Sequence, residues 1–465
     1  FITSYPDFPK QELLQRRAEA ALDEEAPSPQ DLVGFFDRHA PLTNSGRARY
    51  ALALASLDRP EALEVAREAW RSGTMSGPAE LYMQGLFGSR FAPEDHDARM
   101  DALLWQGDSE GAARQAVRVS PQSRALAMAR LSLLQGSMPD TSALAPNVAR
   151  SDPGYIYNLV RHYRTSRQMP QAIALLTSRP SFEQPAFDPE AMIGEMLSVA
   201  RGASPGQAAQ IAASVDDLFA PGFDVSTGSY RLRDDYTSLV WLGGTSALWD
   251  LGDGSRAAPL FYRYGAAAQT PQTRSKGFYW AGLAAKRAGM TDEANRYYEM
   301  AAEYADRFYG QLALKELGRP VPKLAADNLT VPTPEARQAF AAQPIVAAVR
   351  EVARDAPWRT GIQFYRELAQ SADTLEEHQM VADLAREIGR RDLAVNVAEA
   401  AGADGADHAR AVEGDASEVL LELRAHLVEG LRERRHVDRP IDERLLHERG
   451  ALEGEDLAGV VGGDV

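Results

Sequence analysis

A short pattern recurs along the chain: one helix ends at a turn residue, and an alanine follows five positions later inside the next helix. Glycine readily adopts the left-handed backbone that often follows a helix end. An acidic residue follows each glycine within three positions, where a helix N-terminus favours negative charge. The four full copies pair Gly107 with Ala112, Gly252 with Ala257, Gly289 with Ala294 and Gly389 with Ala394; their acids are Asp108, Asp253, Asp292 and Asp392. Two weaker copies replace the glycine with Leu57, before Ala62, and with Arg167, before Ala172.

The segment 275–318 contains one unit of this repeat. Two helices are expected on either side of Gly289, with Thr291 capping the second helix. A third helix is expected from about Phe308 to Gly318. The apolar and small residues at helical spacing are Trp280, Leu283, Ala284 and Ala288 in the first helix, and Ala294, Tyr297, Tyr298, Ala301 and Ala302 in the second. Paired short helices of this kind are the unit of an α-solenoid.

Helix starts elsewhere support the same class. Three pairs place proline at the first helical position: Ser28-Pro29, Ser120-Pro121 and Thr270-Pro271. Thr374 with Glu377 forms a capping-box pattern. The Val, Ile and Thr alternation of strands is nearly absent. We therefore predict an all-α fold, an α-solenoid superhelix of tetratricopeptide-like helical hairpins followed by a smaller helical linker domain.

Proline content sets the expected domain boundaries. The solenoid is expected over 1–318, and a proline-rich connection over 319–334 interrupts helical structure. A small helical linker domain is expected over 335–401. A loop rich in Gly, Pro and Ser is expected over 221–228.

Composition excludes several functions. The net charge of −16 argues against nucleic-acid binding, which needs a basic surface. The absence of cysteine removes disulfides and thiolate chemistry. Apolar runs such as 345–349 are too short to span a bilayer. The chain begins with Phe1, so we expect that a signal peptide was removed or that the sequence is a fragment.

The tail from Ala401 onward differs from the rest of the chain. It has no aromatic residue, and sixteen acidic residues against eight arginines give it a charge of −8. One interpretation of 402–465 is a frameshifted or chimeric end beginning near residue 403. The alternative is a genuine acidic tail, disordered or partly helical over 418–435. Its histidines lie too far apart in sequence for a compact metal site, and they are His408, His426, His436 and His447.

Several phrases resemble one family in order and spacing. They are FYGQLA at 308–313, DHDARMDALLWQG at 95–107, the segment from Asp235-Tyr236 through Trp241 to 251–253, and LAREIGRRDLA at 384–394. Together they are similar to the superhelical and linker regions of soluble lytic murein transglycosylases, over about 20–400. The resemblance implies a superhelix curved into a ring or U, a periplasmic location, and peptidoglycan glycan strands as the partner.

The resemblance does not extend to the family's chemistry. There, a lysozyme-like domain uses one glutamate, in a Glu-Ser dipeptide followed by Gly-Leu-Met-Gln, to cleave the bond between N-acetylmuramic acid and N-acetylglucosamine with a 1,6-anhydro product. The chain contains neither motif, and the phrase at 134–139 is interpreted as a helix end and turn. We therefore expect no catalytic residue, no metal and no cofactor here, and no cleavage by this chain alone. The alternative is a tetratricopeptide-like adaptor that binds a protein or peptide.

Two groups of residues are candidate binding sites. The cluster of Arg161, His162, Tyr163 and Arg164 could meet anionic stem peptides, although a solvated helix face is the more ordinary interpretation. Five tryptophans could stack on sugars, but aromatic residues at solenoid spacing usually pack between repeats; they are Trp70, Trp105, Trp241, Trp249 and Trp280. The sequence has no phosphate loop, zinc-protease motif or serine-protease signature.

Overall fold

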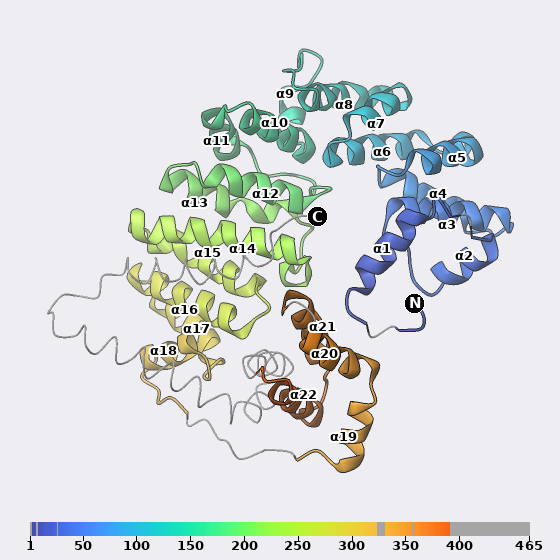
Figure 1. Cartoon of the computed structure of the whole chain (residues 1–465). Coiled ribbons are helices and arrows are strands. Elements are labelled where there is room, and N and C mark those ends of the chain that lie inside the picture. The colour runs from blue at the N-terminus through green and yellow to red at the C-terminus, as the bar shows by residue number, and fades with distance from the viewer. Residues whose placement is uncertain (1, 6–7, 26, 323–330, 356–357, 391–465) are drawn as a thin grey trace. The chain divides into compact units, whose positions relative to one another are not determined.

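Short helices follow one another along nearly the whole described chain (Figure 1). The computed structural model describes residues 2–5, 8–25, 27–322, 331–355 and 358–390. Within these residues no β-strand occurs, which confirms the predicted all-α class. Among the described helices, none has both the length and the apolar character needed to cross a membrane.

The described residues fall into two units. One holds those within 1–324 and 356–367, and the other holds those within 325–355 and 368–465. Residues of α21 (Trp358–Gln370) up to Glu367 belong to the first unit. The boundaries expected at 318, 334 and 401 stay a prediction. The connection predicted over 319–334 lies between the end of α18 at Glu316 and the start of α19 at Pro334. The tail predicted over 402–465 lies outside the described residues.

The first half of the first unit contains eleven described α-helices. They are α1 (Gln11–Ala21), α2 (Pro29–Phe36), α3 (Asn44–Ser56), α4 (Ala62–Arg71), α5 (Gly77–Phe87), α6 (Pro93–Gln106), α7 (Ser109–Gln115), α8 (Pro121–Leu134), α9 (Pro146–Ser151), α10 (Pro153–Thr165) and α11 (Met169–Ser178). Its second half continues with α12 (Pro189–Ala200), α13 (Pro205–Ala213), α14 (Tyr230–Thr245), α15 (Gly254–Ala267), α16 (Pro271–Arg287), α17 (Thr291–Ala302) and α18 (Phe308–Glu316). Many helices that follow one another in sequence pack together, as Figure 1 shows for α14 to α17.

The repeat pattern has the predicted backbone. Gly107, Gly252 and Gly289 all have a left-handed φ of 66–76°. The alanine of each copy is buried in the next helix, and Asp108 and Asp253 accept backbone hydrogen bonds at the N-termini of α7 and α15. In the weaker copies, Arg167 has a φ of 60°, whereas the left-handed residue of the other copy is Asp58 and not Leu57. Ala394 and Asp392 lie outside the described residues.

The prediction that Thr291 caps a helix is wrong. The cap is Met290, whose carbonyl accepts a hydrogen bond from the backbone N–H of Ala294 at 2.9 Å. Thr291 is already the first helical residue, so its hydroxyl is not the capping group. The helix starts predicted at Pro29, Pro121 and Pro271 are confirmed, and the side chain of the residue before each proline accepts a hydrogen bond from a backbone N–H three residues later.

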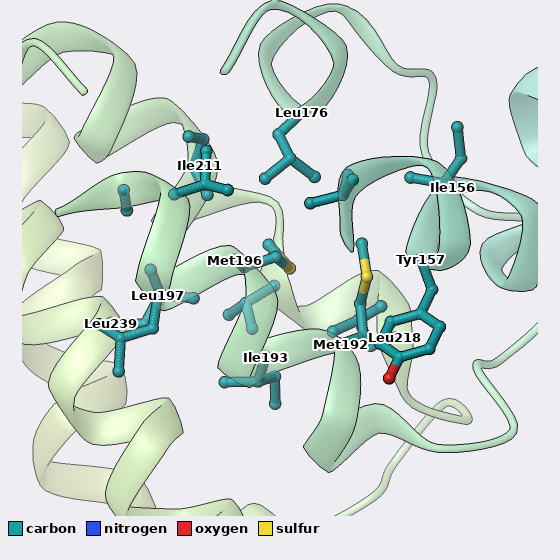
Figure 2. Packing of buried hydrophobic residues seen from close by; sticks show 14 of the residues in the cluster. Ile156, Tyr157, Leu176, Met192, Ile193, Met196, Leu197, Ile211, Leu218 and Leu239 are labelled. Atoms are coloured by element: carbon teal, nitrogen blue, oxygen red, sulfur yellow. The ribbon is translucent and has the colours of Figure 1, made fainter. Parts of the chain in front are cut away.

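Several clusters of buried apolar side chains lie between the helices of the first unit. Figure 2 shows side chains from α10, α11, α12 and α13 meeting in its middle part; the labelled residues include Ile156, Leu176, Met192, Met196 and Ile211. All five are buried. Each of these helices packs apolar side chains against the helix before it and the helix after it. Neighbouring repeats therefore bury one another's apolar side chains.

Among its described residues, the second unit contains three further helices in full: α19 (Pro334–Ala341), α20 (Pro344–Asp355) and α22 (Leu375–Glu387). The capping box predicted for Thr374 and Glu377 is confirmed at the start of α22. Arg350 of α20 donates two hydrogen bonds to Glu387 of α22, at 2.8 and 2.9 Å. This paired geometry links the two helices.

Ala294→Phe is expected to lower the free energy of unfolding by about 1–3 kcal/mol, the usual effect of overpacking. Ala294 is 2% exposed and packs in the apolar cluster of α15 to α18. A phenyl ring there must separate α17 from its neighbours. Thermal melting measures the effect, and an unchanged midpoint would contradict the close packing at this position.

Candidate functional site

The phrase at 95–107 forms a buried charge network around the start of α6. Asp95 is fully buried, and its carboxylate accepts a hydrogen bond from the backbone N–H of Ala92 at 2.8 Å. The same carboxylate pairs with Arg71 at 2.5 Å and with Arg67 at 3.5 Å, both on α4. A buried carboxylate needs such partners. Asp95 therefore joins two successive repeats.

Arg99 is the second buried charge of this network. Its side chain is 1% exposed and its guanidinium lies 3.9 Å from the ring centroid of Trp70. It donates a hydrogen bond to the carbonyl of Gly73 at 2.7 Å and pairs with Glu80 at 3.4 Å. Burial lowers the pKa of Arg99 to about 10, although the charge of Glu80 opposes this. The guanidinium therefore remains charged at neutral pH.

His96 lies beside this network, where Trp70 Nε1 donates a hydrogen bond to His96 Nδ1 at 3.3 Å. Gln115 donates a hydrogen bond to the His96 carbonyl at 3.0 Å. Burial, followed by the positive charge of Arg118, lowers the pKa of His96. These residues serve the packing of α4, α6 and α7, and His96 also lines a cavity of about 690 Å³ together with Arg118 and Ser120.

His96 is expected to weaken the fold as the pH falls. The pKa of His96 is lower in the folded protein, so the unfolded chain takes up a proton first as the pH drops below ~6.5. The contribution of neutral His96 to folding stability is therefore complete above pH ~6.5. It is lost progressively as the pH falls from there to the lowered pKa of the folded protein. Melting midpoints measured from pH 7 to 5 should fall more steeply for the wild type than for His96→Gln. Parallel slopes would contradict the assignment.

The cluster 161–164 does not form one exposed basic surface. Arg161 donates a hydrogen bond to the Tyr157 hydroxyl at 2.9 Å, and His162 is buried. Arg164 donates two hydrogen bonds to Glu195 of α12, at 2.5 and 2.9 Å, which raises the pKa of Arg164. Since the carboxylate already holds this guanidinium, the cluster is not arranged to receive an anionic peptide.

The tryptophans pack between helices. Trp70 and Trp105 are buried, and the ring of Trp105 stacks on Tyr157 with 4.5 Å between centroids. Trp249 and Trp280 meet edge to face at 5.1 Å. Trp241 is half-buried and lies 5.1 Å from the ring of Phe261. Their positions fit the packing role that is ordinary for aromatic residues in solenoids.

A cavity of about 600 Å³ lies where two connecting segments, 182–185 and 216–225, meet α14 and α15. Its walls are held by the Arg179 side chain, which is 2% exposed and pairs with Asp217 at 2.7 Å. The same guanidinium lies 4.0 Å from the ring centroid of Phe182. The backbone N–H of Ala186 donates a hydrogen bond to the Leu218 carbonyl at 3.0 Å. The two segments are therefore fastened to each other, and we call the space between them the loop cavity.

The polar lining of the loop cavity centres on Asp216. Its carboxylate accepts a hydrogen bond from the Tyr236 hydroxyl at 2.7 Å and pairs with Arg263 at 2.8 Å. Burial, followed by the charge of Asp216, raises the pKa of Tyr236, so the phenol stays protonated. Asp216 itself remains exposed and keeps lone pairs for further donors.

An aromatic pair forms the rim of the loop cavity. The rings of Phe219 and Phe223 stack in parallel, with 5.0 Å between centroids and 3° between planes. Gly222 turns the chain with a φ of 83°, and Phe223 is left 46% exposed. The pKa of the adjacent Asp224 is lowered by hydrogen bonds from Ser226, of which the side-chain bond has the larger effect and the backbone bond the smaller. The rim thus combines the exposed aromatic ring of Phe223 with the ionised carboxylate of Asp224.

The loop cavity was not predicted from the sequence, although Phe223 of its rim lies in the loop predicted over 221–228. The available signal was a pair of phenylalanines four residues apart beside a Pro-Gly turn, outside any helical stripe. Within the part of the chain that the structure describes, no group of His, Asp and Glu is placed to hold a metal ion. The arrangement can bind a polar ligand with one apolar face.

No protein-family model and no curated protein matches the chain. Among solved structures, it is similar to an inactive mutant of the lytic transglycosylase Slt from Pseudomonas aeruginosa, with 18% identity and a TM-score of 0.52, covering 91% of this chain and 66% of that one. It also matches the 70-kDa soluble lytic transglycosylase from Escherichia coli, with 16% identity and a TM-score of 0.40, covering 87% of this chain and 63% of that one. The chain thus spans about two thirds of their lengths. The first likeness confirms the resemblance at the level of the fold.

Proposed function

Because the chain shares its helical fold with a lytic transglycosylase, we propose that it is the non-catalytic superhelical part of a periplasmic protein that acts on peptidoglycan. The observation that carries the proposal is the match to the Pseudomonas aeruginosa structure over 91% of this chain. The sequence phrases at 95–107 and 308–313 support it independently. In this role the solenoid holds glycan strands for a catalytic site elsewhere.

Three described carboxyl groups have a raised pKa, but each is only partly buried. Breaking a glycosidic bond needs an acid that is still protonated near neutral pH, which requires a raised pKa. Among the described residues, burial raises the pKa of Asp152, Asp235 and Glu367. Asp152 caps α10 through the backbone N–H of Tyr155, and none of the three lines the loop cavity. The family's Glu-Ser dipeptide is not in the sequence.

The test is sedimentation with purified peptidoglycan sacculi. We expect the chain to sediment with sacculi and to release no 1,6-anhydro muropeptides above a buffer control. Serum albumin serves as the control for trapping in the pellet. Release of anhydro products would contradict the non-catalytic role. Failure to sediment would contradict glycan holding and favour the alternative of an adaptor for a protein partner.

A further inference from the structure

The loop cavity is acidic and open to solvent. Glu183, Asp216, Asp217 and Asp224 contribute four carboxylates to its lining, against the single guanidinium of Arg263. Asp216 and Asp217 are already paired with arginines, but Glu183 and Asp224 are exposed. An anionic ligand would be repelled from this lining, whereas a neutral ligand that donates hydrogen bonds would find acceptors.

The rim supplies the apolar complement. Phe219 and Phe223 each cover one face of the other's ring, and Phe223 remains 46% exposed at the edge of the cavity. An exposed aromatic ring offers a flat apolar surface to the C–H face of a sugar ring. The hydroxyl groups around that sugar can then donate to the neighbouring carboxylates.

Size and rigidity fit the same ligand class. The volume of about 600 Å³ lies within the range of ~300–1,000 Å³ that is usual for ligand clefts. Arg179 and the Ala186–Leu218 hydrogen bond hold the walls without a ligand. Binding therefore does not have to pay the entropy of ordering them.

We propose that the loop cavity binds a neutral N-acetylated sugar unit of the glycan backbone, with Phe223 packed against the sugar ring and Asp224 accepting a hydroxyl hydrogen bond. This inference rests on the proposed function and names the part of peptidoglycan that the solenoid holds. On this proposal, the loop cavity binds the uncharged glycan backbone and not the anionic stem peptides.

The first test measures binding of a soluble oligomer of N-acetylglucosamine by titration calorimetry, with a free stem peptide as the anionic probe. We expect the oligosaccharide to bind and the stem peptide not to bind. Phe223→Ala should weaken oligosaccharide binding by about three- to tenfold, the range for one aromatic contact. Asp224→Ala should weaken it as well. Circular dichroism and melting of each variant show whether the fold is retained.

The matched control is Phe308→Ala, because Phe308 is 54% exposed and lies outside the loop cavity. It should bind the oligosaccharide like the wild type. No oligosaccharide binding by the wild type, equal binding by Phe223→Ala and wild type, or binding of the stem peptide instead would overturn the proposal.

Sedimentation separates this proposal from the proposed function. If the wild type and Phe223→Ala both sediment with sacculi but bind the oligosaccharide equally, the holding role stands and the loop cavity is not the site. If the wild type does not sediment at all, the proposed function itself fails.

Discussion

Gly277→Ala is expected to lower the free energy of unfolding by about 1–3 kcal/mol or more, although it adds a single methyl group. Gly277 lies on α16, directly against Gly265 of α15. A Cβ at residue 277 would lie 2.4 Å from the Gly265 nitrogen, 2.5 Å from its Cα and 2.9 Å from the Phe261 carbonyl oxygen. These are backbone atoms, which cannot rotate away, so α15 and α16 must separate.

The matched control is Gly85→Ala on α5. A Cβ there meets nothing within 4 Å, and the position is exposed in a helix. The same substitution should therefore raise stability by about 0.5–1 kcal/mol, because alanine has less backbone freedom to lose in a helix. Thermal melting of both variants gives opposite shifts if the contact between α15 and α16 is as described. Shifts of the same sign would show that Gly277 is not at a close approach.

Trp70→Ala is expected to lower the free energy of unfolding by about 3–5 kcal/mol, the usual loss for a buried tryptophan. Trp70 is completely buried, and its ring stacks on Phe91 with 4.9 Å between centroids. The substitution also removes the ring beneath the Arg99 guanidinium, which stays buried in the gap. A buried charge that loses a partner adds to the loss.

Hydrogen exchange can locate the effect of Trp70→Ala. Repeats contact mainly their neighbours, so amides of α4 and α6 should lose more protection than amides of α16. Phe308→Ala is the control, and its exposed ring should change stability by less than about 0.5 kcal/mol. Equal loss of protection in α6 and α16 would contradict local coupling around Trp70.

Much of the fold could be predicted from local patterns. Gly107, Gly252 and Gly289 end helices because their left-handed backbone is a local property that glycine reveals in the sequence. Thr291 misled the prediction because several residues near a helix start can cap it, and the hydrogen bonds of Met290 set the boundary one residue earlier. The assignment of α21 residues up to Glu367 to the first unit could not be foreseen, because it depends on packing between segments that are distant in sequence.

The candidate site was harder to predict because its parts are far apart in sequence. Phe182, Asp216, Tyr236 and Arg263 meet only after four helices have stacked. The phrase containing Asp95 and Arg99 was recognised as a family resemblance, yet its role in joining repeats depends on Trp70 and Arg71, which lie on a different helix. Sequence patterns indicate helix ends well, but they do not say which side chains face each other across the stack.

Arg167 stands where other copies of the repeat have glycine, and its backbone has the same left-handed shape. A residue with a Cβ usually disfavours this conformation by roughly 1–2 kcal/mol. The repeat therefore tolerates local strain where neighbouring helices already fix the turn. A residue better suited to the left-handed backbone at this position would raise the melting temperature without changing any buried contact. A chain of this type therefore need not be as stable as its fold allows.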